Sequence, residues 1–239
     1  MQNYKRLKKV TMSTNKKTDS VENVDRALSS AEQFIEDNQK SITTVIAIIL
    51  GVIAIFVGIK KLYIAPKELE AQSQMFYAQK YFEIDSMNLA LYGDGNNLGF
   101  LDIIDNYGIT KSANLAKYYA GICYLHQGNF DDAIEYLEKY KKKDELLASV
   151  AYGATGDAYV EQGNFDKGLH YYNKAIGLES NKFTTPIYLM KAGGVYEELG
   201  EYEQALEIYN RIKKDFGETD QARTIDKYIA RAEALKSKE

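Results

Sequence analysis

The chain has 239 residues, of which 27% are charged and 45% hydrophobic, a balance typical of folded globular protein rather than disordered chain. Its formal net charge is −4, and the acidic excess falls after residue 40, so the composition argues against a nucleic-acid-binding surface, which needs clustered Lys and Arg. The single cysteine, Cys123, excludes a disulfide framework within one chain and a cysteine-rich metal site.

The first segment, residues 1–40, contains eight Lys/Arg and six Asp/Glu, and we expect a basic, partly helical N-terminal arm. Met12 stays open as an alternative start, because the residues that follow it, Ser13-Thr-Asn-Lys-Lys, form a more typical N-terminus.

The second segment is an apolar run, Ser41 to Ile59, with nineteen residues and no charge. Such a helix is long enough to cross a hydrocarbon core of about 30 Å, so we predict a transmembrane helix over residues 41–62. A buried core helix is disfavoured because soluble helices rarely lack a polar face for five turns. A cleaved signal peptide is disfavoured because the run starts late and has no small-residue cleavage site after it.

The charges beside this run do not decide its orientation. Lys60, Lys61 and Lys67 follow it closely, which by the positive-inside rule favours a cytoplasmic C-terminal domain. The arm before it is basic overall, and a long C-terminal domain can translocate largely regardless of charge.

Residues 63–112 are predicted to form a stalk helix and a degenerate helical repeat. The two helical stretches are Leu69 to Leu91 and Leu98 to Tyr107, with a break at Gly93-Asp-Gly95. The sequence Gly93-Asp-Gly-Asn-Asn97 resembles a fragment of a calcium loop but lacks the later ligands, so a tight turn is the favoured interpretation.

Residues 113–218 contain three copies of one pattern, whose first glycines are 35 and 37 residues apart. Each copy has a mid-helix glycine, a tyrosine, a second glycine where the helix ends, an aromatic residue that opens the next helix, and a small residue. The three sets are Gly121, Tyr124, Gly128, Phe130, Ala133; Gly156, Tyr159, Gly163, Phe165, Gly168; and Gly193, Tyr196, Gly200, Tyr202, Ala205. This period is typical of a helical solenoid, in which the first glycine and the small residue allow two helices to approach closely.

The pattern resembles the tetratricopeptide repeat. The resemblance implies an all-α fold, a right-handed solenoid of helical hairpins, preceded here by one transmembrane helix. Two features depart from the family: Lys117 and Leu189 occupy a position that is usually aromatic, and the usual closing proline is absent at Ser180 and Gly217. After the repeats, residues 219–239 are predicted to form a capping helix with Thr219 as N-cap and an apolar face of Ile225, Tyr228, Ile229 and Ala232.

A second resemblance concerns the whole layout. The segments Val24-Asp-Arg-Ala-Leu and Phe34 to Lys40 lead straight into the apolar run, and a repeat domain follows. This arrangement is similar to the single-span ancillary subunits of the bacterial Sec translocon. The resemblance implies an inner-membrane protein with a cytoplasmic N-terminus, periplasmic repeats, and the export channel and a periplasmic chaperone as partners.

No catalytic constellation appears in the sequence, and we predict neither an enzyme nor a cofactor. The two histidines, His126 and His170, fall at non-equivalent places of different repeats. Cys123 is expected to be a small buried apolar residue.

A solenoid acts through the surface it displays, and in this family the first helix of each pair lines the inner face. We therefore predict a protein-binding groove whose residues are Tyr118, Ile122, Leu125, Gly153, Asp157, Val160, Met190 and Glu197. The Lys and Asn residues with which some relatives clamp a peptide carboxylate are absent, since their places hold Tyr118, Ile122, Gly153, Asp157, Met190 and Gly194.

Such a groove suits apolar or mildly basic polypeptide, whether unfolded or a partner helix. The alternative that the stalk helix, Pro66 to Leu91, fills part of it stays open at this point. The predicted function is a membrane-anchored scaffold or chaperone-like adaptor at the export channel or in envelope biogenesis. The alternative is a structural component of an envelope secretion, outer-membrane assembly or division machine without client binding.

Overall fold

The structure is a computed structural model that describes residues 29, 32–178 and 180–238. It divides into two compact units, Met1–Tyr63 and Ile64–Glu239, which are described separately. Most of the predicted basic arm lies outside the described residues; within its described part, residues 32–37 are helical.

The apolar run of the first unit forms a helix, α2 (Gln39–Gly58), followed by a short π-helical segment, η1 (Ile59–Ile64). No residue of α2 is buried, and most of its Ile, Val, Leu and Phe side chains are exposed. The helical segment Gln39–Glu83 contains a stretch of at least 18 residues that is strongly apolar. This length and composition would allow one membrane crossing.

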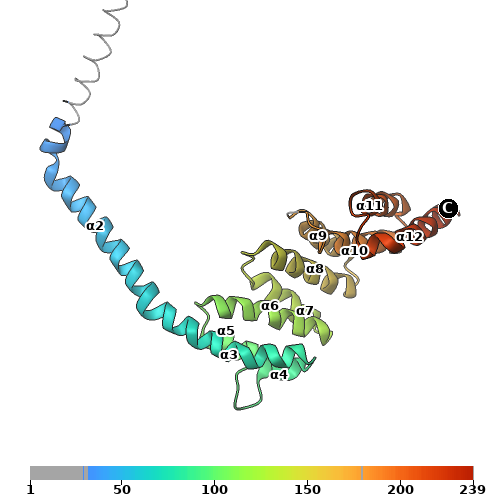
Figure 1. Cartoon of the computed structure of the whole chain (residues 1–239), viewed down its shortest axis with the longest axis horizontal. Helices are drawn as coiled ribbons and strands as arrows, with labels where there is room; N and C mark the ends of the chain where they lie inside the picture. Colours follow the sequence, from blue (N-terminus) through green and yellow to red (C-terminus); the bar gives the residue numbers. More distant parts are fainter. Residues whose placement is uncertain (1–28, 30–31, 179, 239) are drawn as a thin grey trace, which may run out of the picture. The chain divides into compact units, whose positions relative to one another are not determined.

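Every regular element described in the second unit is a helix, as predicted. The elements in chain order are α3 (Ala65–Glu83), α4 (Met87–Tyr92), α5 (Phe100–Asn106), α6 (Lys111–His126), α7 (Phe130–Lys139), α8 (Glu145–Glu161), α9 (Phe165–Ile176), α10 (Thr185–Glu198), α11 (Tyr202–Asp215) and α12 (Asp220–Lys236). Three antiparallel hairpins, α6–α7, α8–α9 and α10–α11, pack in sequence order, and each second helix also contacts the first helix of the next hairpin (Figure 1). The predicted helical-hairpin solenoid is therefore confirmed.

The repeated glycines explain the close hairpins. Gly128, Gly163 and Gly200 have φ values of 76°, 75° and 76°, a left-handed conformation that ends the first helix of each hairpin. The mid-helix glycines make room for the second helix: a Cβ on Gly156 would lie 2.7 Å from the Tyr172 ring. The core that results contains Cys123, which is fully buried as predicted, and burial raises the pKa of its thiol to about 12.

The structure corrects the prediction for residues 63–112. The stretch from Leu69 to Leu91 is not one helix, because the chain breaks at Asp85, which has a φ of 62°. The helix α3, in the place of the predicted stalk helix, packs against α4 and α6 and so belongs to an additional, irregular hairpin. The loop at Asp94 is a tight turn: its carboxylate accepts hydrogen bonds from the backbone amides of Asn96 and Asn97 and from the Tyr81 hydroxyl.

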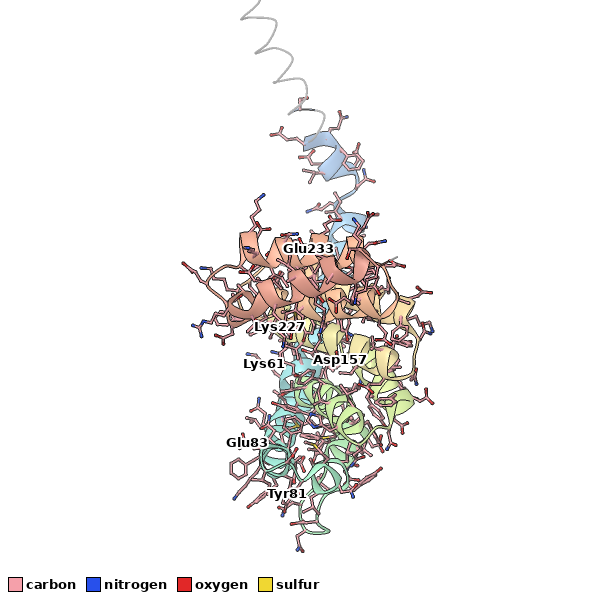
Figure 2. The ribbon with its side chains drawn as sticks, turned by 90° about the vertical axis from the view of Figure 1, so that its right-hand side faces the viewer. Lys61, Tyr81, Glu83, Asp157, Lys227 and Glu233 are labelled. Atoms are coloured by element: carbon pink, nitrogen blue, oxygen red, sulfur yellow. The ribbon has the colours of Figure 1, made fainter. Side chains whose placement is uncertain are left out.

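Each end of the solenoid is closed by a helix. At the C-terminal end, α12 buries Ile225 and Ala232 against the last hairpin, while Lys227 and Glu233 are exposed on it (Figure 2). The helix α12 occupies the place of the predicted capping helix, although the Thr219 hydroxyl donates to the carbonyl of Phe216 and does not cap the helix. At the N-terminal end, the Glu68 carboxylate accepts from the Lys111 and Ser112 amides at 2.6 and 3.2 Å and so caps α6 from α3.

Candidate polypeptide-binding groove

A groove of about 810 Å³ opens beside the C-terminal halves of α6, α8 and α10. Its apolar surface comes from the ends of the first helices and from the aromatic residues that open α7 and α9. These apolar residues are Leu125, Phe130, Val160, Phe165 and Val195. The groove exists because three successive hairpins contribute equivalent turns to it, so its shape depends on the stacking of the repeats.

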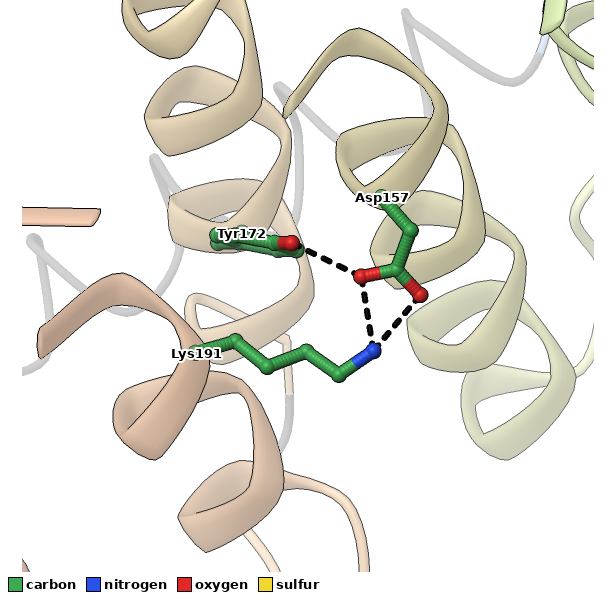
Figure 3. Close-up of polar contacts among 3 residues, drawn as sticks. All are labelled: Asp157, Tyr172 and Lys191. Atoms are coloured by element: carbon green, nitrogen blue, oxygen red, sulfur yellow. Dashed lines mark hydrogen bonds and ion pairs between the residues drawn. The ribbon is translucent and has the colours of Figure 1, made fainter. Parts of the chain in front are cut away.

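One side of the groove is held by a polar contact between three helices. Asp157 on α8 accepts a hydrogen bond from the Tyr172 hydroxyl on α9 at 2.7 Å, and the Lys191 ammonium on α10 bridges both of its carboxylate oxygens at 2.7 and 2.6 Å (Figure 3). Burial, and then the charge of Asp157, raises the pKa of Tyr172, so the hydroxyl stays a donor at any physiological pH. The contact fixes the second repeat to the third and neutralises the charge of Asp157 inside the groove.

Other polar residues lining the groove are open to solvent. Glu161 ends α8, Glu198 ends α10 and His126 ends α6, and all three are exposed. Because Lys191 balances Asp157, the two glutamates leave this surface with a net negative charge. Gly194 of α10 also lines the groove, and no atom lies within 4 Å of the place a Cβ would take.

Three of the eight predicted groove residues, Leu125, Asp157 and Val160, line this groove. Tyr118 and Ile122 do not, because they pack inward against a cluster that contains Leu137 and Tyr140. Burial raises the pKa of Tyr118 to about 12, and its ring lies 5.7 Å from that of Tyr140. These two side chains connect the first repeat to the second.

Gly153 is covered rather than exposed. A Cβ at Gly153 would lie 1.8 Å from Cε1 of Tyr188, so the ring of this α10 tyrosine rests directly on the α8 backbone. The same ring stacks on Tyr172 at 6.2 Å between centroids. The inner face is therefore closed at Gly153 and opens one turn later, at Asp157.

The last two predicted groove residues, Glu197 and Met190, contact side chains of the C-terminal part of the domain. The Glu197 carboxylate pairs with the guanidinium of Arg231 on α12, and its side chain is only 10% exposed. Met190 is half-buried against the apolar cluster of the last two hairpins. Whether the eight residues bind protein stays a prediction.

The residues that the sequence analysis missed are Glu161, Glu198, Phe130 and Phe165. A signal was available, since Glu161 and Glu198 lie one helical turn after Asp157 and Gly194 on the same face. Within the described residues, no group of three or more His, Cys, Asp or Glu side chains is placed to hold a metal ion.

Comparison with known proteins agrees with this architecture. Residues 100–146 and 154–221 match the family model described as tetratricopeptide repeat. No curated protein matches the chain in sequence.

Solved structures with a similar fold include the MamA protein, at 19% identity and a TM-score of 0.49, covering 70% of this chain and 92% of that one. Another is a Podosopora anserina kinesin-light-chain-like protein with nearly identical TPR-like repeats, at 14% identity and a TM-score of 0.55, covering 71% of this chain and 88% of that one. Together with the three hairpins and their repeated glycines, the family match shows that residues 100–146 and 154–221 form tetratricopeptide repeats.

Proposed function

We propose that this protein is a membrane-anchored scaffold that binds segments of other proteins in the groove beside α6, α8 and α10. Tetratricopeptide repeats imply a protein-interaction scaffold, and a repeat domain displays a long surface without built-in chemistry. The groove carries the proposal, because it combines apolar residues of three successive repeats with charged residues of the second and third. We propose neither an enzymatic activity nor a cofactor, and no binding of nucleic acid.

The membrane anchor is supported by α2. Its side chains Ile55 and Phe56 are 66% and 67% exposed, and no part of the helix is buried. An isolated helix with this much exposed apolar surface is stable in a bilayer, whereas in water it would aggregate. The exposed glutamates of the groove are compatible with a domain that works outside the bilayer.

The location is proposed from the layout of the chain. A basic arm, one apolar helix and a repeat domain are the order found in the ancillary subunits of the bacterial protein-export channel. We propose a single-pass protein of the bacterial inner membrane with its N-terminus in the cytoplasm, its repeats in the periplasm, and the export channel and a periplasmic chaperone as partners.

A second candidate is a structural subunit of an envelope machine that has no client. One observation favours it: Phe183 and Leu146 are 77% and 50% exposed and line a separate hollow of about 550 Å³ at the start of α8 and just before α10. A permanent subunit contact could cover this hollow and leave the groove unused.

Site-specific photocrosslinking in cells separates the two candidates. A photoreactive residue at Val160 lies in the groove, one at Phe183 lies in the other hollow, and one at the exposed Gln204 of α11 is the control. The scaffold proposal expects several protein adducts from Val160 and none from Gln204. A single adduct from Phe183 with none from Val160 would refute it.

The anchor and the orientation are tested on the same cells. The intact chain should remain with membranes after carbonate washing, and a reporter that is active only outside the cytoplasm should work when fused after Glu239. Activity of a cytoplasm-only reporter at that position would overturn the periplasmic location together with the export-channel partner.

A further inference from the structure

One glycine inside a helix of the repeats, Gly194, has no packing reason in the structure. Gly121, Gly156 and Gly193 each lie beneath a side chain of the following helix, within 2.3 to 2.7 Å of where a Cβ would be. Gly194 is different: it is exposed, it lies inside α10, and nothing within 4 Å would meet its Cβ. Glycine there costs α10 about 1 kcal/mol relative to alanine, and no internal contact offsets this cost.

The position of Gly194 suggests what offsets the cost. It lines the groove, one helical turn after the Lys191 that holds Asp157. A helix without a side chain at this point exposes its backbone and leaves space for another chain to come close. The equivalent positions of the earlier repeats carry side chains, Ile122 and Asp157, so the space is confined to the third repeat.

The charge of the groove identifies the kind of chain. Glu161 and Glu198 line it, and in the described part of the chain neither has a salt-bridge partner. Lys191, which also lines the groove, is already engaged by Asp157. An approaching chain therefore meets apolar surface bordered by two carboxylates that have no cation of their own.

We propose that the groove takes an extended segment of a partner protein in which a bulky apolar residue stands beside a lysine or arginine. The apolar side chain packs on Leu125, Val160 and Phe165. The cation pairs with the carboxylates of Glu161 and Glu198, and the segment's backbone passes over Gly194. This specificity rests on the proposed function of the groove and adds the chemistry of its ligand.

The test uses the full chain in detergent and four labelled ten-residue peptides, with binding followed by fluorescence anisotropy. The first peptide contains two Leu-Lys-Phe triplets, the second Leu-Glu-Phe, the third Leu-Gln-Phe, and the fourth Ser-Lys-Ser. We expect the first to bind at least tenfold more tightly than the second and the fourth, and severalfold more tightly than the third. The preference should shrink as salt is raised, because the carboxylates are exposed.

Two variants connect the binding to the groove. Gly194→Leu fills the space on α10 and should weaken binding of the first peptide at least tenfold without lowering the melting temperature. Glu161→Gln combined with Glu198→Gln should bring the first and third peptides to equal affinity. Gln204→Leu, which adds the same side chain as Gly194→Leu on the exposed surface of α11, should change neither.

The outcomes separate the ligand chemistry from the groove itself. If the Leu-Gln-Phe and Leu-Lys-Phe peptides bind equally and Gly194→Leu weakens both, the groove binds polypeptide but the charge preference is wrong. If Gly194→Leu leaves the affinity for the Leu-Lys-Phe peptide unchanged, the ligand does not pass over α10 and the inference is overturned. If no peptide binds the wild-type chain, both the inference and the proposed function fail.

Discussion

Two adjacent glycines of α10 should respond in opposite ways to the same substitution. Gly193 is buried, and a Cβ there would lie 2.3 Å from Cε1 and 2.8 Å from Cζ of Tyr209, whose side chain is fully buried. Gly194 is exposed and meets nothing. We expect Gly194→Ala to stabilise the domain and Gly193→Ala to destabilise it relative to Gly194→Ala.

The magnitudes follow from two terms. Both substitutions gain about 1 kcal/mol of helix propensity. Gly193→Ala also forces the Tyr209 ring to move within a packed core, and such overpacking costs about 1–3 kcal/mol. Because the propensity gain is common to both variants, the difference between them measures the overpacking cost alone. For a unit of the size of Ile64–Glu239, 1 kcal/mol corresponds to a change of about 2–4 °C in melting temperature.

The assay is thermal and urea unfolding of the full chain in detergent, followed by circular dichroism. A control background, Tyr209→Leu, removes the ring that the new methyl group would meet, so Gly193→Ala should there become as favourable as Gly194→Ala. If Gly193→Ala stabilises the wild-type chain as much as Gly194→Ala does, the close approach of α10 and α11 does not constrain this position and the reasoning is wrong.

The remaining predictions concern the other contacts that hold the domain together. Gly153→Ala should destabilise the domain by about 1–3 kcal/mol in the same unfolding assay, because its Cβ would lie 1.8 Å from Tyr188. An unchanged melting temperature would contradict the packing of the Tyr188 ring on Gly153. Tyr118→Asp should lower the melting temperature by several degrees, since it places a charge in a half-buried cluster. An unchanged melting temperature would show that Tyr118 is exposed on the inner face after all. Burial alone would raise the pKa of Glu68, but the hydrogen bonds from Ser112 and Lys111 lower it below its ordinary value. The stability from this cap is therefore fully present above the ordinary pKa and is lost as the pH falls through the lowered one, so a gap in melting temperature between wild type and Glu68→Gln should exist at neutral pH and close in acid.

The helical hairpins could be predicted because their signals are local. A glycine that ends a helix with positive φ, an aromatic residue two positions later and a small residue after it each act within a few residues, and three copies confirm one another. The irregular first hairpin had no such repetition. Its break at Asp85 depends on how α3 and α4 pack on α6, which cannot be read from the apolar spacing of residues 69–91.

The groove was harder to predict because neighbouring helices decide which residues of a first helix are buried and which are exposed. Tyr118 has the spacing of an inner-face residue, but it packs against Tyr140, which follows the last turn of α7 in the same hairpin. Glu197 also has that spacing, and Arg231 of the capping helix covers it. Both partners lie outside the repeated pattern, so comparing the three copies with one another gives no warning of them.

A single side chain decides where the inner face opens. Tyr188 leans from α10 onto Gly153, stacks on Tyr172, and so closes the face over the middle of α8. The Tyr172 hydroxyl then reaches Asp157, which in turn fixes Lys191. Beyond this chain of contacts, Val160 and Glu161 at the end of α8 and Gly194 and Glu198 at the end of α10 line the groove. The opening is therefore a consequence of how the second repeat packs on the third, and changes at Gly153 or Tyr188 should alter binding without touching the ligand.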